Sequence, residues 1–159
     1  MNWEYFHLIS HPFAIVLPIV GVAAGVAGWI SGREWLERYG VLSILLGGIA
    51  AIPSYFTGIA AADDVTQRVF VAPGIVQTHR TWATWAAVVL VTGAIFAAYS
   101  MSQPKEGRLR RFVLLVGAGA ALLTALAAFR GGKIEHEDEA AVGRDTPAEA
   151  AQPAEKESE

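Results

Sequence analysis

Long apolar runs alternate with short polar segments along most of this 159-residue chain. Four runs of about 20 residues stand out, at residues 11–30, 41–62, 81–100 and 112–130. A helix of about 20 residues is long enough to cross the hydrocarbon core of a bilayer. None of the runs has a charged residue in its interior, and none shows the polar stripe that a helix of a soluble bundle needs. The pattern therefore predicts four membrane-spanning helices.

The composition changes after the fourth run. Residues 135–159 are rich in Glu, Ala and Pro and nearly lack large apolar side chains, which is typical of disordered segments. We therefore expect an all-α, integral-membrane four-helix bundle over residues 1–134 and a disordered acidic tail over residues 135–159. Small residues on the helix faces favour close helix packing, and they also leave room for a flat ligand. The sequence shows no clear internal repeat.

Composition excludes several classes of protein. Apolar residues make up 53% of the chain and charged residues only 17%, whereas soluble domains carry about 25% charged residues. The net charge of −3 argues against a nucleic-acid partner, which would require a basic face. Because the chain has no cysteine, it cannot form disulfides, thiolate metal sites, iron–sulfur clusters or covalent c-type haem attachments.

Four spans place both termini on one side of the membrane, called side A here, together with the loop between the second and third runs. Side B, which holds the other two loops, carries six basic and three acidic residues, and side A carries six basic and twelve acidic ones. Basic residues near span ends favour the cytoplasmic side. We therefore predict a multi-pass protein of the bacterial inner membrane with side B in the cytoplasm and both termini in the periplasm.

The histidines and the charged side chains nearest to them are predicted to lie on side A. Alternate threading of the spans brings all four histidines to that side, and the acidic and basic residues nearest to them lie there as well. These side chains are His7, His11, His79, His136, Asp63, Asp64, Arg68 and Arg80. His7 precedes the first apolar run, so we expect it to face lipid headgroups rather than a site.

Three interpretations fit this set of side chains. First, His11 and His79 begin two co-directional spans at similar depth, so both could ligate a b-type haem, with Arg68 and Arg80 pairing with its propionates. Second, His11, His79 and His136 with Asp63 or Asp64 could bind zinc or copper. Third, the side chains could simply meet water and headgroups, as polar residues at span ends often do. No nucleophile–base pair stands out, which favours a non-enzymatic protein.

Several short motifs resemble the bacterial four-span membrane-protein family catalogued as domain of unknown function 2231. They are His11-Pro12 with Pro18-Ile19 in the first run, Ile52-Pro53 and Thr57-Gly58 in the second, Thr78-His79 before the third, and Gly131-Gly132 after the fourth. The chain differs from that family at Val16, where a His or Asp is frequent, and at Lys133–His136. The resemblance implies a four-span fold and, because the family's domain occurs joined to Rieske-type or cytochrome c-type domains, a link to electron transfer.

The leading interpretation is therefore a b-type haem-binding redox subunit, with His11 and His79 as axial ligands near the periplasmic face. Its expected partners are membrane lipid and a membrane or periplasmic redox protein, with homo- or hetero-oligomers open. The alternatives are a cofactor-free accessory subunit of a larger membrane complex and a zinc- or copper-binding membrane protein.

Overall fold

The computed structural model describes residues 2–67, 73–103 and 107–142, with the backbone alone for residues 63, 64, 73 and 133–142. The described chain is made of four helices and contains no strand, which confirms the all-α prediction. The helices are α1 (Trp3–Ser31), α2 (Glu34–Thr66), α3 (Pro73–Ser102) and α4 (Gly107–Val142). All four are long and apolar enough to cross a membrane, so the chain has the architecture of a multi-pass membrane protein.

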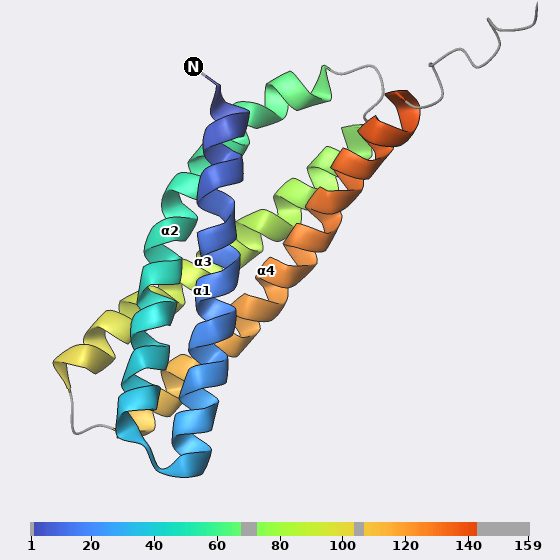
Figure 1. The fold of residues 1–159 in the computed structure, drawn as a ribbon. Coiled ribbons are helices and arrows are strands. Elements are labelled where there is room, and N and C mark those ends of the chain that lie inside the picture. The colour runs from blue at the N-terminus through green and yellow to red at the C-terminus, as the bar shows by residue number, and fades with distance from the viewer. Residues whose placement is uncertain (1, 68–72, 104–106, 143–159) are drawn as a thin grey trace, which may run out of the picture.

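The helices form two antiparallel hairpins, α1–α2 and α3–α4, that pack into a four-helix bundle (Figure 1). Around the bundle, α2 contacts α3 and α4 contacts α1, while α1 and α3 lie diagonally opposite and their described backbones do not approach each other. Figure 1 shows the N-terminus of α1 and the C-terminal end of α4 at the same end of the bundle, as predicted. It also shows the second hairpin crossing behind the first at an angle, so that the side-A ends of α1 and α4 lie apart in this view while the end of α2 bends toward α3.

Near side B the bundle is tightly packed. Val41, Ile44 and Val113 are each at most 1% exposed and belong to one apolar cluster. One turn further toward side B, the buried carboxylate of Glu37 lies 3.2 Å from the guanidinium Nε of Arg110. This ion pair joins α2 to α4 across the diagonal of the bundle.

The first hairpin is held together by a close approach of α1 and α2. A Cβ atom on Gly40 would overlap the backbone of Gly21 and Gly25, so glycine at these positions lets the two helices touch along their backbones. Gly32 then ends α1 with a φ of +68°, a conformation that residues with a Cβ atom adopt only at a cost.

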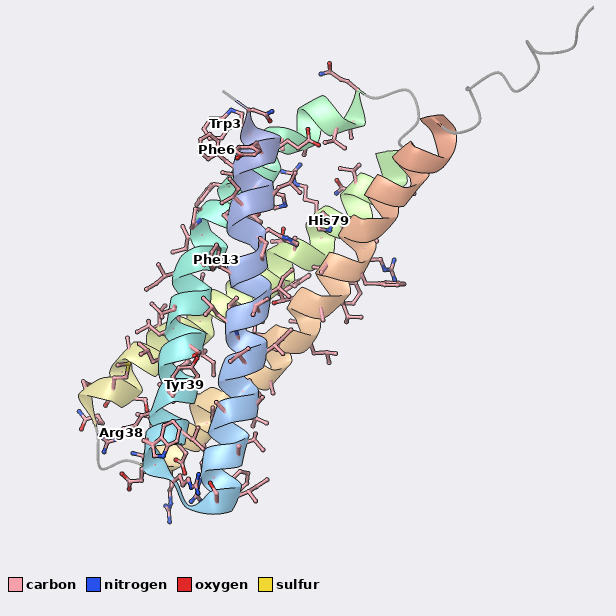
Figure 2. All side chains as sticks on the ribbon, in the orientation of Figure 1. Trp3, Phe6, Phe13, Arg38, Tyr39 and His79 are labelled. Carbon is pink, nitrogen blue, oxygen red and sulfur yellow. The ribbon has the colours of Figure 1, made fainter. Side chains whose placement is uncertain are left out.

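The outer surface is apolar along the spans. Large side chains on it include Phe13, Ile30 and Leu115, of which the last two are 81% and 71% exposed, and Figure 2 shows Trp3, Phe6 and Phe13 around the exposed sides of α1. The helices extend beyond the predicted runs at both ends. In particular, α4 continues to Val142, eight residues beyond the predicted boundary at residues 134/135. The rest of the predicted tail lies outside the described residues.

Candidate functional site

A cavity of about 600 Å³ lies between the two hairpins toward side A, within the usual size range of small-ligand sites. All four helices contribute to its wall, which combines Ala, Gly and larger apolar residues with three imidazoles, a guanidinium, the carboxylate of Glu4 and a few hydroxyls. The residues whose chemistry matters here are His7, His11, Ser54, Tyr55, Gly58, His79, Arg80, Thr124 and Gly131. The small apolar residues leave the space open, and the imidazole nitrogens are the atoms in the wall that could bind a metal.

His7 is held in one orientation by α2. Its Nδ1 lies 2.8 Å from the carbonyl oxygen of Ser54, and because a carbonyl can only accept a hydrogen bond, Nδ1 carries the proton. The ring also lies against Gly58, where an added Cβ atom would come within 2.9 Å of the His7 Cε1 atom. In the neutral ring, the Nε2 lone pair is not used by this hydrogen bond to α2, so it is available to a ligand.

His79 is held in the same way by α4. Its Nδ1 donates to the carbonyl oxygen of Ala127 at 2.9 Å, and its ring lies against Gly131, where a Cβ atom would be 3.0 Å from Cε1. Histidines that bind metals usually donate their second ring N–H to a carbonyl or carboxylate, which fixes the tautomer and makes the ligating nitrogen more basic. His7 and His79 both carry this arrangement.

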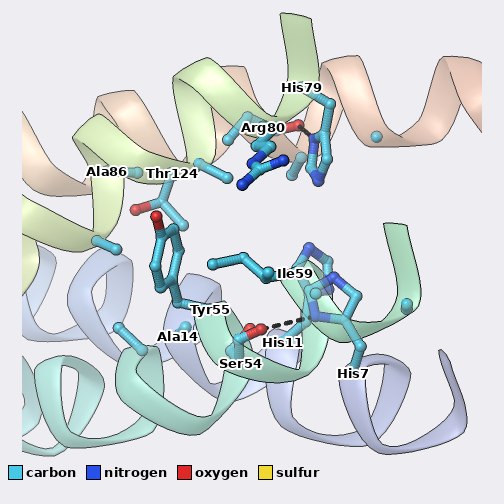
Figure 3. Close-up of a pocket in the computed structure, with 18 of the residues that line it drawn as sticks. His7, His11, Ala14, Ser54, Tyr55, Ile59, His79, Arg80, Ala86 and Thr124 are labelled. Carbon is cyan, nitrogen blue, oxygen red and sulfur yellow. Dashed lines mark hydrogen bonds between the residues drawn. The ribbon is translucent and has the colours of Figure 1, made fainter. Parts of the chain in front are cut away.

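His11 lies one helical turn after His7 and lines the same cavity. The two ring centroids are 5.4 Å apart, with the ring planes inclined by 42°. Within the described part of the chain, the His11 ring makes no hydrogen bond. Figure 3 shows His7 and His11 on one side of the cavity and His79 facing them from the other side. Imidazoles from the diagonal helices α1 and α3 thus share one space.

A hydroxyl pair joins α2 to α3 at the part of the cavity away from the imidazoles (Figure 3). The Tyr55 hydroxyl lies 3.3 Å from Thr84 Oγ1, and Thr84 already donates its proton to the carbonyl oxygen of Arg80 at 2.8 Å. Tyr55 is therefore the donor to Thr84. The Arg80 side chain lines the cavity and extends beside His79 in Figure 3, so one cation is available to an anionic group of a ligand.

The predicted site residues are only partly brought together by the described structure. His11, His79 and Arg80 line one cavity, as the haem interpretation requires. Asp63 and Asp64 lie in α2 and His136 lies in α4, but their side chains are outside the described part of the chain, as is all of Arg68. Among the described side chains, no group of three or more His, Cys, Asp or Glu residues is placed to hold a metal ion.

The expectation that His7 faces headgroups is wrong. Helix α1 begins at Trp3, eight residues before the predicted run, and this extension carries His7 into the cavity wall. The sequence did contain a signal for this, because His7 and His11 are four residues apart and residues at that spacing share one face of a helix.

No protein-family model, no curated protein and no solved structure matches this chain. The resemblance to the four-span family therefore stays a prediction, and the geometry of the cavity carries the functional argument alone.

Proposed function

We propose that this chain is a small integral-membrane subunit that binds b-type haem in the side-A cavity and transfers electrons. His79 of α3 supplies one axial ligand and an imidazole of α1 supplies the other. The observation that carries the proposal is the pairing of imidazoles across one cavity: His79 faces the histidines of the diagonal helix, and its Nδ1–H is already bound to the Ala127 carbonyl.

The residues present fit such a group. Two neutral imidazoles are sufficient axial ligands for a haem iron, and no cysteine is required. The cavity volume of about 600 Å³ lies within the range of ligand sites, and small Ala and Gly residues from all four helices form part of its wall. Arg80 supplies the positive charge that a propionate needs. When bound, the haem would supply one-electron redox chemistry, while the chain orients the ligands and excludes water from the apolar part of the cavity.

The location of the cavity also supports an electron-transfer role. It lies near the end of the bundle where α1 begins and α4 ends, and the distribution of basic residues favours the periplasm for that end. In this orientation, in the bacterial inner membrane, the site would exchange electrons with a periplasmic or membrane redox protein at side A.

The test is the absorption spectrum of the pure protein. The full-length chain, made in cells supplied with haem precursor and purified in mild detergent, should contain about one haem per chain with a Soret band that sharpens on reduction. His79→Ala should remove the bound haem, whereas Thr81→Ala, an exposed change two residues away, should not. His79→Met keeps one imidazole and replaces the other ligand by a thioether, so it should retain haem at a raised reduction potential.

The alternative functions give different results in the same experiment. A protein that takes up no haem, either in cells or when titrated with hemin in detergent, would refute the proposal. Stoichiometric zinc or copper that is lost in Asp64→Ala would support a metal-binding protein instead. A protein that contains neither haem nor metal and copurifies with a larger membrane assembly would support the accessory-subunit alternative.

A further inference from the structure

The two hairpins line the cavity largely with residues at equivalent positions, although the sequence shows no clear repeat. The lining residues of α1 are Glu4, His7, Leu8, His11, Ala14 and Ile15, and each has a lining residue of α3 exactly 72 positions later. Five lining residues of α2, at positions 51, 54, 55, 58 and 59, likewise have counterparts in α4 at 73 positions later. Both hairpins run from side A to side B and back, so a rotation about an axis along the bundle relates them, as in membrane proteins with parallel repeats.

The repeated register reproduces the geometry of one histidine in each hairpin. His7 and His79 are counterparts, and so are the glycines against which their rings lie, Gly58 and Gly131. The carbonyls that accept their Nδ1–H groups, at positions 54 and 127, are counterparts too, with hydrogen bonds of 2.8 and 2.9 Å. A rotation of this kind places the two imidazoles on opposite sides of its axis, which is where the two axial ligands of one iron have to lie.

His11 does not take part in this symmetry. Its counterpart in α3 is Ala83, which lines the cavity without a ligating atom. The His11 ring also lacks the carbonyl partner that fixes the other two rings within the described chain. His11 therefore has neither a symmetry-related imidazole in α3 nor a carbonyl partner that fixes its tautomer.

We infer that His7 and His79, one from each hairpin, are the two axial ligands, and that Gly58 and Gly131 are positioning residues that seat their rings. This inference rests on the proposed haem function and replaces His11 by His7 in the ligand pair. A methyl group at either glycine would displace the ring and lengthen the hydrogen bond from Nδ1–H to the carbonyl oxygen. His11 then lies beside the ligand pair without binding the iron.

The first experiment compares His7→Ala, His11→Ala and His79→Ala by absorption and electron paramagnetic resonance spectroscopy of the full chain with haem. The wild type should show a low-spin signature typical of two imidazole ligands. His7→Ala and His79→Ala should lose it, and His11→Ala should keep it. Because a loss could come from misfolding, His7→Gly is also titrated with free imidazole, which should restore the low-spin signal.

The outcomes separate the two levels of the proposal. If the wild type binds haem but His11→Ala loses the low-spin signature while His7→Ala keeps it, the ligand assignment is wrong and the haem function stands. If His7→Gly recovers no low-spin signal with imidazole while His11→Gly does, the assignment is likewise overturned. If the wild type binds no haem, both the function and the assignment fail.

The second experiment tests the glycine seats with two glycines of the same helix, α4. A Cβ atom on Gly131 would be 3.0 Å from the His79 ring, whereas one on Gly119, which lies outside the cavity wall, meets no atom within 4 Å. Loss of a ligand's supporting contact typically weakens metal binding about 10–100-fold, so Gly131→Ala should bind haem at least about tenfold more weakly, with a shifted reduction potential. Gly119→Ala should match the wild type in both. Equal effects of the two substitutions would overturn the positioning role of Gly131.

Discussion

Removing the buried carboxylate of Glu37 should be among the most destabilising single changes in this bundle. The Glu37 side chain is 8% exposed and the Arg110 side chain 9% exposed, with their charged atoms 3.2 Å apart. Glu34 also contacts Arg110, but at 3.8 Å and with a side chain that is 65% exposed. Glu37→Ala therefore removes the buried carboxylate that lies against this guanidinium, and the exposed carboxylate of Glu34 does not replace it. Removing one partner of a buried ion pair typically costs about 3–5 kcal/mol.

The matched control is Glu34→Ala in the same helix. This change removes the exposed pair with Arg38 at 3.3 Å and the 3.8 Å contact with Arg110. Because the Glu34 carboxylate is largely exposed, its ion pairs should contribute only about 0–1 kcal/mol. The double variant Glu37→Met with Arg110→Met removes both buried charges and should recover most of the stability, because replacing a whole buried pair by apolar side chains is often neutral. The cycle of single and double variants gives the coupling between the two side chains.

The assay is reversible unfolding in mixed micelles, followed by tryptophan fluorescence, with the free energy of unfolding compared between variants. The reasoning predicts a large loss for Glu37→Ala, a small one for Glu34→Ala and recovery in the double variant. A loss for Glu37→Ala within about 1 kcal/mol of that for Glu34→Ala would refute it, since a gap of at least about 2 kcal/mol is expected from the burial of the first pair.

Three further predictions use the same unfolding measurement. Gly40→Ala should destabilise the protein by about 1–3 kcal/mol because its methyl group would overlap the backbone of α1. Gly119→Ala places its methyl group in open space, so it should be neutral or stabilising by up to about 1 kcal/mol. Equal effects of the two substitutions would contradict the close approach of α1 and α2. Gly32→Ala should cost about 1–2 kcal/mol because a Cβ atom disfavours its φ of +68°, and an unchanged free energy would contradict that backbone geometry. Ile44→Ala should cost about 2–5 kcal/mol by opening a cavity at a fully buried position. Leu115 is 71% exposed, so Leu115→Ala should cost less than about 1 kcal/mol. A larger loss of stability for Leu115→Ala than for Ile44→Ala would contradict the packing.

Much of the architecture could be predicted from the sequence because it depends on local properties. The length and hydropathy of each run determine whether a helix can cross a bilayer, and the number of runs places the N-terminus and the end of α4 at one end of the bundle, as the structure confirms. The same alternation put His11, His79 and Arg80 toward one side, and all three line one cavity.

The choice of packing faces could not be predicted. In a membrane protein the lipid-facing surface is as apolar as the interior, so hydropathy does not show which face of a helix meets its neighbours. Ile44 and Leu115 look alike in the sequence, yet the first is fully buried and the second is 71% exposed. For the same reason, the diagonal placement of α1 and α3 and the buried pair of Glu37 and Arg110 became visible only in three dimensions.

The site shows the same division between local pattern and tertiary packing. The sequence determined which residue types are available at side A, since a histidine keeps its place along a helix whatever surrounds it. Only the tertiary structure decided that His7 enters the cavity, and that glycines and carbonyls 47 to 52 positions away from each ring hold His7 and His79 alike. These contacts depend on the shape and register of a neighbouring helix. The sequence shows where the small residues lie, but it does not show which neighbouring helix each of them will meet.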